Sequence, residues 1–353
     1  MSLMLEEIRQ QPSALEKTLR GELRNFERLK KRLANKPPRL VLLAARGTSD
    51  NAAQFGRYLL EIATGVPVSL AAPSIFTLYR AHMRLEDALV VALSQSGEST
   101  DTNYVLEQAR EAGARTVGIT NEAESALARL AEHTFVVRAG KEKSIAATKT
   151  YTGQMIALYL LAWALGAPVD LDDLRQLPAR AQAALGFEQQ IGDIAERYTF
   201  MTRCVVVGRG LNYSNTYEFA LKLMETCYVV AERFSAADLL HGPIAMVETA
   251  FPVFLFAPSG VTWPGLAEML EKLRKLKAET LVFTDASNRA ALALTRRAIC
   301  LPMKLAHKGA LPEEVYTPIP YIIPAQMFAA LLADQKGLDP DRPRTLSKVT
   351  QTL

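Results

Sequence analysis

The two halves of this 353-residue chain repeat the same short sequence landmarks in the same order. The matching pairs are "LLAARG" and "VVVGRG", "SQSG" and "APSG", and "TVGIT" and "TLVFT". The two members of each pair lie 163 or 164 residues apart. Three ordered landmarks at one spacing indicate a duplicated structural unit. We therefore expect two copies of one fold in tandem.

Each half alternates short apolar runs with helical patterns. The first half has apolar runs at 40–45, 66–70, 88–94, 116–120 and 134–138, and a long helix over about 148–166 closes it. The second half has runs at 203–208, 251–258, 279–284 and 297–302, with helices over about 212–228, 264–276 and 321–336. Such alternation is typical of a parallel sheet with helices on both faces. The predicted fold class is α/β, with two doubly wound, flavodoxin-like domains.

The remaining segments complete the predicted domain organisation. Residues 1–34 form charged amphipathic helices that split near Pro12, and 339–353 is an irregular tail with two prolines. The predicted units are a helical leader (1–34), a first domain (35–168), a helical connector (169–198), a second domain (199–338) and the tail (339–353).

Composition narrows the class of partner. The chain has 41 Lys and Arg against 37 Asp and Glu without a basic block, which favours a small anionic ligand over nucleic acid. The longest apolar stretch, 155–169, is too short to cross a bilayer and is interpreted as a buried helix. Cys204, Cys227 and Cys300 are scattered, and the first ten residues are polar. We therefore expect no signal peptide, no membrane contact and a reducing, cytoplasmic location.

Two hydroxyl-rich segments in the first half end predicted strands and lead into helices. They are "RGTS" (46–49) and "SQSGES" (94–99). In a doubly wound sheet, ligands bind beyond the carboxyl ends of strands, and hydroxyls at helix N-termini hold phosphates. Ordinary helix capping also uses Ser and Thr. The second copy has "RGLNYS" and "APSGVT" instead, which favours an anion site over a structural need. "IAATKT" (145–150) is either a cap or a third wall of that site.

The second half carries candidate acid–base groups. Lys222 and Glu225 lie three residues apart, on one face of a predicted helix. They form either a surface ion pair or, with the carboxylate partly buried, a proton shuttle. His241 stands in the loop "HGP" and is either solvated or functional. No HExxH, paired CxxC or dinucleotide fingerprint occurs, so we expect neither a metal nor a cofactor.

Taken together, these motifs resemble a known family. "RGTS", "LSQSGES", "ATK", "GRG", "YEFALKLMET", "HGP" and "DPDRPRTLSKVT" are similar to segments of the isomerase module of glucosamine-6-phosphate synthase. They are also similar to its stand-alone relatives with sugar-isomerase (SIS) domains, which include a type of glucosamine-6-phosphate deaminase. The resemblance covers about residues 35–350.

The resemblance implies a sugar-phosphate pocket built by both copies. The family's phosphate-binding residues correspond to Thr48, Ser49, Ser94, Gln95, Ser96 and Ser99, and further substrate contacts correspond to Gly47, Ala146, Ala147 and Thr148. The enolisation base corresponds to Glu225, its neighbouring lysine to Lys222, the ring-opening histidine to His241 and the C-terminal-loop lysine to Lys348. In the family the histidine comes from the partner subunit, which implies a homodimer.

Two substitutions and one absence separate this chain from the synthase. Arg46 stands where the synthase has cysteine, and Ala147 stands where it has serine. The identity of the substrate therefore stays open. The synthase's N-terminal nucleophilic cysteine has no counterpart, because the chain begins "MSLMLEE" and its first cysteine is Cys204. Without that thiol, glutamine hydrolysis is not expected.

The resemblance thus leaves several functions open. The expected function is conversion of glucosamine 6-phosphate to fructose 6-phosphate and ammonia. The alternative is an isomerase module that works toward glucosamine 6-phosphate, as in glutamine–fructose-6-phosphate aminotransferase. A related amino-sugar phosphate or glycated amine is a third possibility, and a non-catalytic sugar-phosphate sensor is the last.

Overall fold

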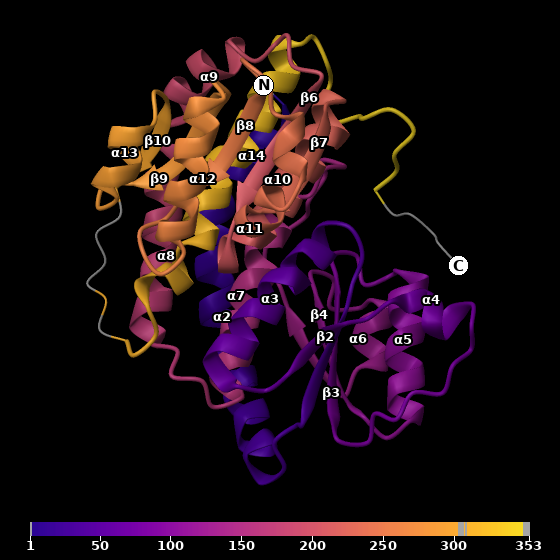
Figure 1. Cartoon of the computed structure of the whole chain (residues 1–353). Coiled ribbons are helices and arrows are strands. Elements are labelled where there is room, and N and C mark those ends of the chain that lie inside the picture. The colour runs from indigo at the N-terminus through magenta and orange to yellow at the C-terminus, as the bar shows by residue number, and fades with distance from the viewer. Residues whose placement is uncertain (1, 303–306, 308, 349–353) are drawn as a thin grey trace.

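The computed structural model describes residues 2–302, 307 and 309–348 and contains two five-stranded parallel sheets (Figure 1). The first comprises β1 (Leu40–Ala44), β2 (Val68–Leu70), β3 (Ala88–Ser94), β4 (Arg115–Thr120) and β5 (His133–Val136), in the order β2-β1-β3-β4-β5. The second comprises β6 (Arg203–Gly208), β7 (Val230–Ser235), β8 (Pro252–Phe256), β9 (Glu279–Asp285) and β10 (Ala298–Leu301), in the order β10-β9-β8-β6-β7. Taken from its other edge, the second sheet repeats the order of the first. The predicted duplicated, doubly wound fold is confirmed.

Helices surround both sheets. In the first half they are α1 (Leu3–Arg9), α2 (Gln11–Asn35), α3 (Thr48–Thr64), α4 (Pro73–Thr77), α5 (Thr100–Glu111), α6 (Ala126–Leu130) and α7 (Lys149–Ala164). The connector forms α8 (Leu171–Leu185) and α9 (Glu188–Glu196). The second half has α10 (Tyr213–Cys227), α11 (Ala236–Leu240), α12 (Trp263–Lys275), α13 (Arg289–Leu294) and α14 (Pro318–Gln335). Short 3-10 helices cover Gly210–Asn212, Pro243–Met246 and Glu313–Tyr316.

Strand β7 is the strand that the sequence pattern did not predict. It pairs only with β6 among the described strands, so it lies at the sheet edge. Its sequence, "VAERFS", places the exposed Val230, Glu232 and Arg233 around the buried Ala231. An edge strand with one solvated face has no continuous apolar run, and for that reason the apolar pattern did not reveal it.

Two buried helices form the centre of the molecule. α7 is buried along nearly its whole length, which confirms the predicted buried helix there, and it packs against α2 and α3. α14 occupies the corresponding place in the second half, against α9 and α10. Its first turn holds Pro318 and Pro320, which the first turn of a helix tolerates, so α14 begins earlier than the predicted residue 321.

The two domains meet through the first helix of each copy. α3 follows β1 and α10 follows β6, and these two helices pack against each other. In Figure 1 the first domain, in indigo and magenta, lies below the second domain, in orange, with α3 near the boundary. Residues in the first turn of α3 therefore face residues along α10, as the hydrogen bonds from Lys222 to Thr48 and from Asn51 to Glu218 show.

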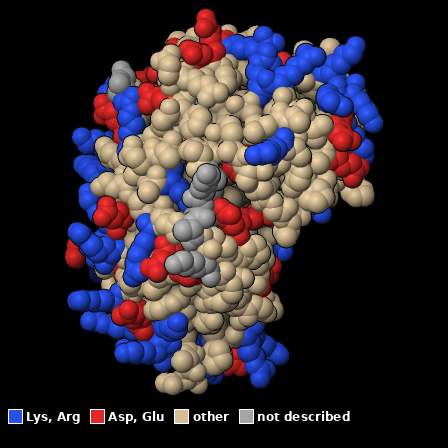
Figure 2. Space-filling view, turned by 90° about the vertical axis from the view of Figure 1, so that its left-hand side faces the viewer, with Lys and Arg blue, Asp and Glu red and all other residues tan. Residues whose placement is uncertain are grey.

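Charged side chains are unevenly distributed over the surface. On the face drawn in Figure 2, Lys/Arg and Asp/Glu side chains alternate around the margin, and uncharged residues fill much of the upper middle. Within residues 2–302, 307 and 309–348, no helix is long and apolar enough to span a bilayer. The same residues contain no group of three or more His, Cys, Asp or Glu side chains that could hold a metal ion.

Candidate active site

A cavity of about 340 Å³ lies where the carboxyl ends of the first sheet meet α10 and the C-terminal tail. Its walls come from the turn after β1, the loop after β3, the segment before α7, α10 and the tail. The lining residues are Arg46, Gly47, Thr48, Ser49, Leu93, Ser94, Gln95, Ser96, Ser99, Ile145, Ala147, Glu225, Leu346, Ser347 and Lys348. Both copies of the fold and the tail thus contribute to one cavity.

Positive φ angles at two glycines shape the hydroxyl-bearing loops. Gly47, with φ of 55°, turns the chain from β1 into the first turn of α3. Gly97, with φ of 68°, closes the loop after β3, and a Cβ there would lie 2.1 Å from Ser125 Oγ. An L-residue at position 97 would therefore meet both backbone strain and a collision.

We expect Gly97→Ala to lower the free energy of unfolding by about 2–4 kcal/mol, because a left-handed backbone and an overpacked methyl group add their costs. Gly113→Ala is the matched control. Gly113 also has a positive φ, of 81°, but the nearest atom to its added Cβ is 4.0 Å away, so only the smaller backbone cost applies. Urea unfolding of both variants measures the difference. Equal losses of stability would contradict this account of the loop.

Three serines in these loops are set to donate hydrogen bonds into the cavity. Each hydroxyl has one proton to donate, and each of these three already accepts a bond from the protein. Ser49 Oγ accepts from Gln154 Nε2 (2.9 Å), Ser94 Oγ from Gly97 N (3.0 Å) and Ser96 Oγ from Glu98 N (3.2 Å). Their hydroxyl protons thus stay available for an anion in the cavity.

Ser99 has a different environment from these serines. Its Oγ donates to Asp101 Oδ1 at 2.8 Å and lies 3.0 Å from Thr102 Oγ1. The proton of the Ser99 hydroxyl is therefore directed at a carboxylate of its own helix and away from the cavity. Ser99 lines the cavity as predicted, but in this arrangement it offers an incoming anion no hydroxyl proton.

A charged triplet on α10 faces α3 behind the cavity wall. Glu218, Lys222 and Glu225 share one helical face, and Lys222 Nζ lies 2.6 Å from Glu225 Oε2 and 3.6 Å from Glu218 Oε1. Lys222 Nζ also donates to Thr48 Oγ1 at 3.2 Å, across the domain boundary. Lys222 is fully buried, whereas the Glu225 side chain is 22% exposed and reaches the cavity. Glu225 is therefore the member of the triplet that a ligand could touch.

Burial changes the acidity of the innermost carboxyl. Glu218 is fully buried, and burial raises its pKa to about 7, although the Lys222 charge and the bond from Asn51 Nδ2 (2.8 Å) act in the opposite direction. Burial also tends to lower the pKa of Lys222, but Glu218 and Glu225 outweigh it and hold that pKa above its usual value. Lys222 therefore stays charged at neutral pH.

The tail closes the cavity through Lys348. Its Nζ donates to Ser144 O at 2.5 Å and lies 3.3 Å from Glu142 Oε2. Glu142 is buried and also accepts hydrogen bonds from Thr148 N (2.9 Å) and from Thr150 Oγ1 (2.7 Å). The tail lysine is thus tied to the segment that leads into α7.

Most of the predicted site residues line the cavity, but four do not. Those that line it are Gly47, Thr48, Ser49, Ser94, Gln95, Ser96, Ser99, Ala147, Glu225 and Lys348. Lys222 lies directly behind Glu225, and the buried Ala146 and Thr148 flank Ala147 without reaching the cavity. His241 is exposed at the end of α11 and is not part of the cavity wall of its own chain.

Three charged residues at the site were given no role from the sequence. Glu218 could have been recognised, because it lies four residues before Lys222 on the same helical face. Glu142 gave no signal, since its loop has no periodic pattern. Arg46 was noted only as a difference from the synthase, and it lines the cavity with its Nε 2.6 Å from Asp101 Oδ2.

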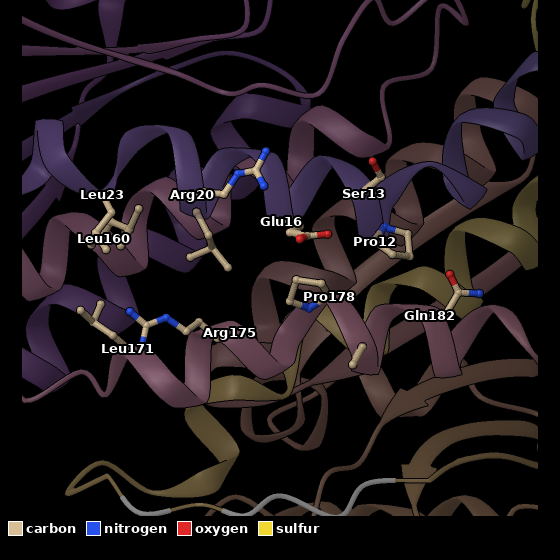
Figure 3. Close-up of a pocket in the computed structure, with 12 residues that line it drawn as sticks. Pro12, Ser13, Glu16, Arg20, Leu23, Leu160, Leu171, Arg175, Pro178 and Gln182 are labelled. Atoms are coloured by element: carbon tan, nitrogen blue, oxygen red, sulfur yellow. The ribbon is translucent and has the colours of Figure 1, made fainter.

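A larger cavity, of about 750 Å³, lies elsewhere, between α2 and α8 (Figure 3). Leu19, Leu23 and Leu160 give it an apolar wall, while Glu16 and Arg20 project from α2 opposite Arg175 on α8. This cavity has neither strand ends nor a hydroxyl cluster, and its one carboxylate lies on an exposed helix face. Size alone therefore does not identify the active site, and the smaller cavity is the candidate.

The fold and this cavity define a class: a duplicated α/β protein with one ligand site built by both copies. A family model described as the SIS domain matches the chain twice, at residues 33–164 and 201–333. The chain belongs to the SIS-domain family of phosphosugar isomerases.

Individual relatives agree with that assignment. The chain is 33% identical over 347 residues to the isomerizing glutamine–fructose-6-phosphate aminotransferase of Aquifex aeolicus, an alignment that covers 98% of this chain and 57% of that protein. The chain thus spans little more than half of that relative. A structure from Silicibacter pomeroyi that is assigned as a phosphosugar isomerase matches with a TM-score of 0.85 and 31% identity, over 97% of this chain and 100% of the other. The glucosamine-6-phosphate deaminase of Thermotoga maritima shares the fold, with a TM-score of 0.72 and 22% identity, over 99% of this chain and 100% of the other.

Proposed function

We propose that this protein converts glucosamine 6-phosphate and water to fructose 6-phosphate and ammonia. One observation carries the proposal: the Glu225 carboxylate, paired with Lys222, lines the same cavity as the serine loops of the first domain. A sugar phosphate held by its phosphate at those loops would place its carbon chain along the wall where Glu225 lies. Similarity to aminotransferases and phosphosugar isomerases supports the same substrate class.

The proposed chemistry moves one proton and then hydrolyses an imine. In the open-chain sugar, Glu225 removes the proton from C2 and returns it to C1, which turns an aldehyde with an amine at C2 into an alcohol with an imine at C2. Water adds to that imine carbon, and ammonia leaves. A single carboxylate can serve both carbons because they are adjacent. The ammonium group of Lys348, which lines the cavity, would stabilise the negative charge that develops on the carbonyl oxygen, while Lys222 would act behind it on Glu225.

His241 has a proposed role that requires a second chain. Ring opening needs a group that moves protons near neutral pH, which suits an imidazole. His241 is exposed and outside the cavity of its own chain. We therefore propose a homodimer in which each chain provides His241 to its partner's cavity.

Complementation between two inactive variants tests this arrangement. We expect Glu225→Gln and His241→Asn to be inactive alone and to regain activity when they are unfolded together and refolded as a mixture. A mixed dimer would contain one intact site and one site with both substitutions, so a statistical mixture should recover about one quarter of wild-type activity. Co-refolding each variant with itself is the control. No recovery, with mixed dimers verified by differential tagging, would exclude a shared site.

The alternative direction has its own support, because the aligned relative is an aminotransferase. In that reaction fructose 6-phosphate and ammonia would give glucosamine 6-phosphate. A related amino-sugar phosphate or a glycated amine would use the same groups with a different substituent on nitrogen. A non-catalytic sugar-phosphate sensor would use the serine loops alone.

One assay separates these functions. Purified protein is incubated with glucosamine 6-phosphate, and ammonia and fructose 6-phosphate are measured, with Glu225→Gln in parallel. The reverse reaction is assayed with fructose 6-phosphate and either ammonium or glutamine. Equal release of both products by the wild type alone supports the deaminase. Net synthesis without measurable release supports the alternative, and binding without turnover in either direction supports the sensor.

A further inference from the structure

We propose that Arg46 is an additional phosphate-contacting residue, held in position by Asp101, and that it gives the site a preference for the dianionic form of a phosphate monoester. This inference rests on the proposed function, because it assigns a further residue to the same phosphate site. The hydroxyl loops alone would hold an anion through neutral donors. Arg46 adds a permanent charge to that wall.

The position of Arg46 comes from the turn after β1. It lies two residues beyond Ala44, the last residue of that strand, and it lines the cavity together with Ser94, Ser96 and Ser99. Its side chain is 52% exposed, and its Nε lies 2.6 Å from Asp101 Oδ2. Among the described residues that contact is the only hydrogen bond of the Arg46 side chain, so both terminal guanidinium nitrogens remain as donors.

Asp101 fixes the guanidinium without lining the cavity. The Asp101 side chain is 3% exposed and lies in the first turn of α5, where a helix favours a carboxylate. Its Oδ1 accepts from Ser99 Oγ and from Thr102 N, both at 2.8 Å. Burial tends to raise the Asp101 pKa, but these bonds and the Arg46 charge together hold that pKa below its usual value. The cation therefore faces the cavity while its anionic partner lies behind it.

This arrangement compensates for the orientation of Ser99. The Asp101 carboxylate takes the Ser99 hydroxyl proton, which removes one neutral donor from the wall. The same carboxylate orients a guanidinium with donors to spare, and guanidinium groups match phosphate oxygens in pairs. A neutral donor is thus exchanged for a charged one at nearly the same place.

Binding of inorganic phosphate and fructose 6-phosphate, measured by calorimetry, tests the inference without turnover. We expect Arg46→Gln to weaken binding of both ligands by about 10-fold or more, because a charge-assisted contact is lost. Binding by this variant should also depend less on salt concentration. The affinity of Arg46→Lys for these ligands should fall between that of Arg46→Gln and that of the wild type. Asp101→Asn, which removes the carboxylate charge beside Arg46 but leaves the guanidinium in place, should show a smaller loss. Arg57→Gln is the control, since Arg57 is a half-exposed arginine of α3 that pairs with Glu61 at 4.0 Å.

A second readout distinguishes a phosphate contact from a purely structural ion pair. The second pKa of a phosphate monoester is about 6, and the guanidinium stays charged throughout. The ratio of dissociation constants for Arg46→Gln and wild type should therefore be larger at pH 7.5 than at pH 5. In the enzyme assay KM should rise while kcat changes little.

The outcomes separate this inference from the proposed function. If Arg46→Gln and Arg46→Lys bind phosphate as tightly as wild type and only melt at lower temperature, Arg46 is structural and the inference is wrong. If the wild type binds phosphate in an Arg46-dependent way but does not turn over amino sugars, the inference stands and the proposed reaction is wrong. If the wild type binds neither phosphate nor sugar phosphate, both are wrong.

Discussion

Glu225→Gln should lower kcat by about 100-fold to 10,000-fold, which is the usual contribution of a general acid–base group. Glutamine has nearly the same shape as glutamate, but it cannot carry a proton from one carbon of the sugar to the next. Because the serine loops that would hold the phosphate remain intact, binding of fructose 6-phosphate should change much less than kcat. Steady-state kinetics with glucosamine 6-phosphate, together with calorimetry, gives both quantities.

Glu232→Gln is a suitable control for this prediction. Glu232 lies on the edge strand β7, is exposed, and does not line the cavity. Its replacement should leave both kcat and ligand affinity near their wild-type values. A Glu225→Gln protein that retains wild-type kcat, or that loses only affinity, would remove Glu225 from the role of base.

Lys222→Met should lower the free energy of unfolding by about 3–5 kcal/mol, the usual cost of breaking a buried ion pair by removal of one partner. Methionine fills the space of the lysine chain but leaves Glu218 and Glu225 without the charge between them. Lys222 is fully buried and contacts both carboxylates as well as Thr48. Urea unfolding measures the loss, and activity should fall with it because Glu225 loses its partner.

Lys272→Met provides the matched comparison. Lys272 pairs with Glu268 at 3.0 Å, one turn away on α12, but both side chains are about half exposed. An exposed pair of this kind contributes about 1 kcal/mol or less. Similar losses for the two variants would mean that the triplet on α10 is no more important to the fold than a surface pair.

Much of the fold follows from the sequence because its strands are buried on both faces. The runs that became β3 and β6 were predicted with the bounds the structure has, since each contains an uninterrupted apolar stretch and is followed by a polar loop. β7 was not predicted because only one of its faces is covered, so it has no continuous apolar run. The internal repeat predicted that the fold is duplicated, and the strand orders of the two sheets agree with that prediction.

The sequence predicted which segments form the site, but it did not predict which of their side chains reach the cavity or pair with one another. The serine loops follow from strand ends and from their absence in the second copy, which is local information. Sequence could not tell that Ala147 reaches the cavity while Ala146 and Thr148 do not, because that depends on how one short segment turns before α7. Nor could it place Glu142 beside Lys348, since 206 residues separate this pair along the chain.

The packing of α3 on α10 bears on how a ligand could enter. The bonds Asn51–Glu218 and Lys222–Thr48 join the two domains next to the cavity, and both involve buried side chains. A hinge motion that parted the domains would break these bonds and expose a buried carboxylate. Displacement of residues 346–348 would break the two contacts of Lys348 and would leave Glu225 and Lys222 in place. Entry of a ligand past the tail would therefore leave the hydrogen bonds between the two domains intact.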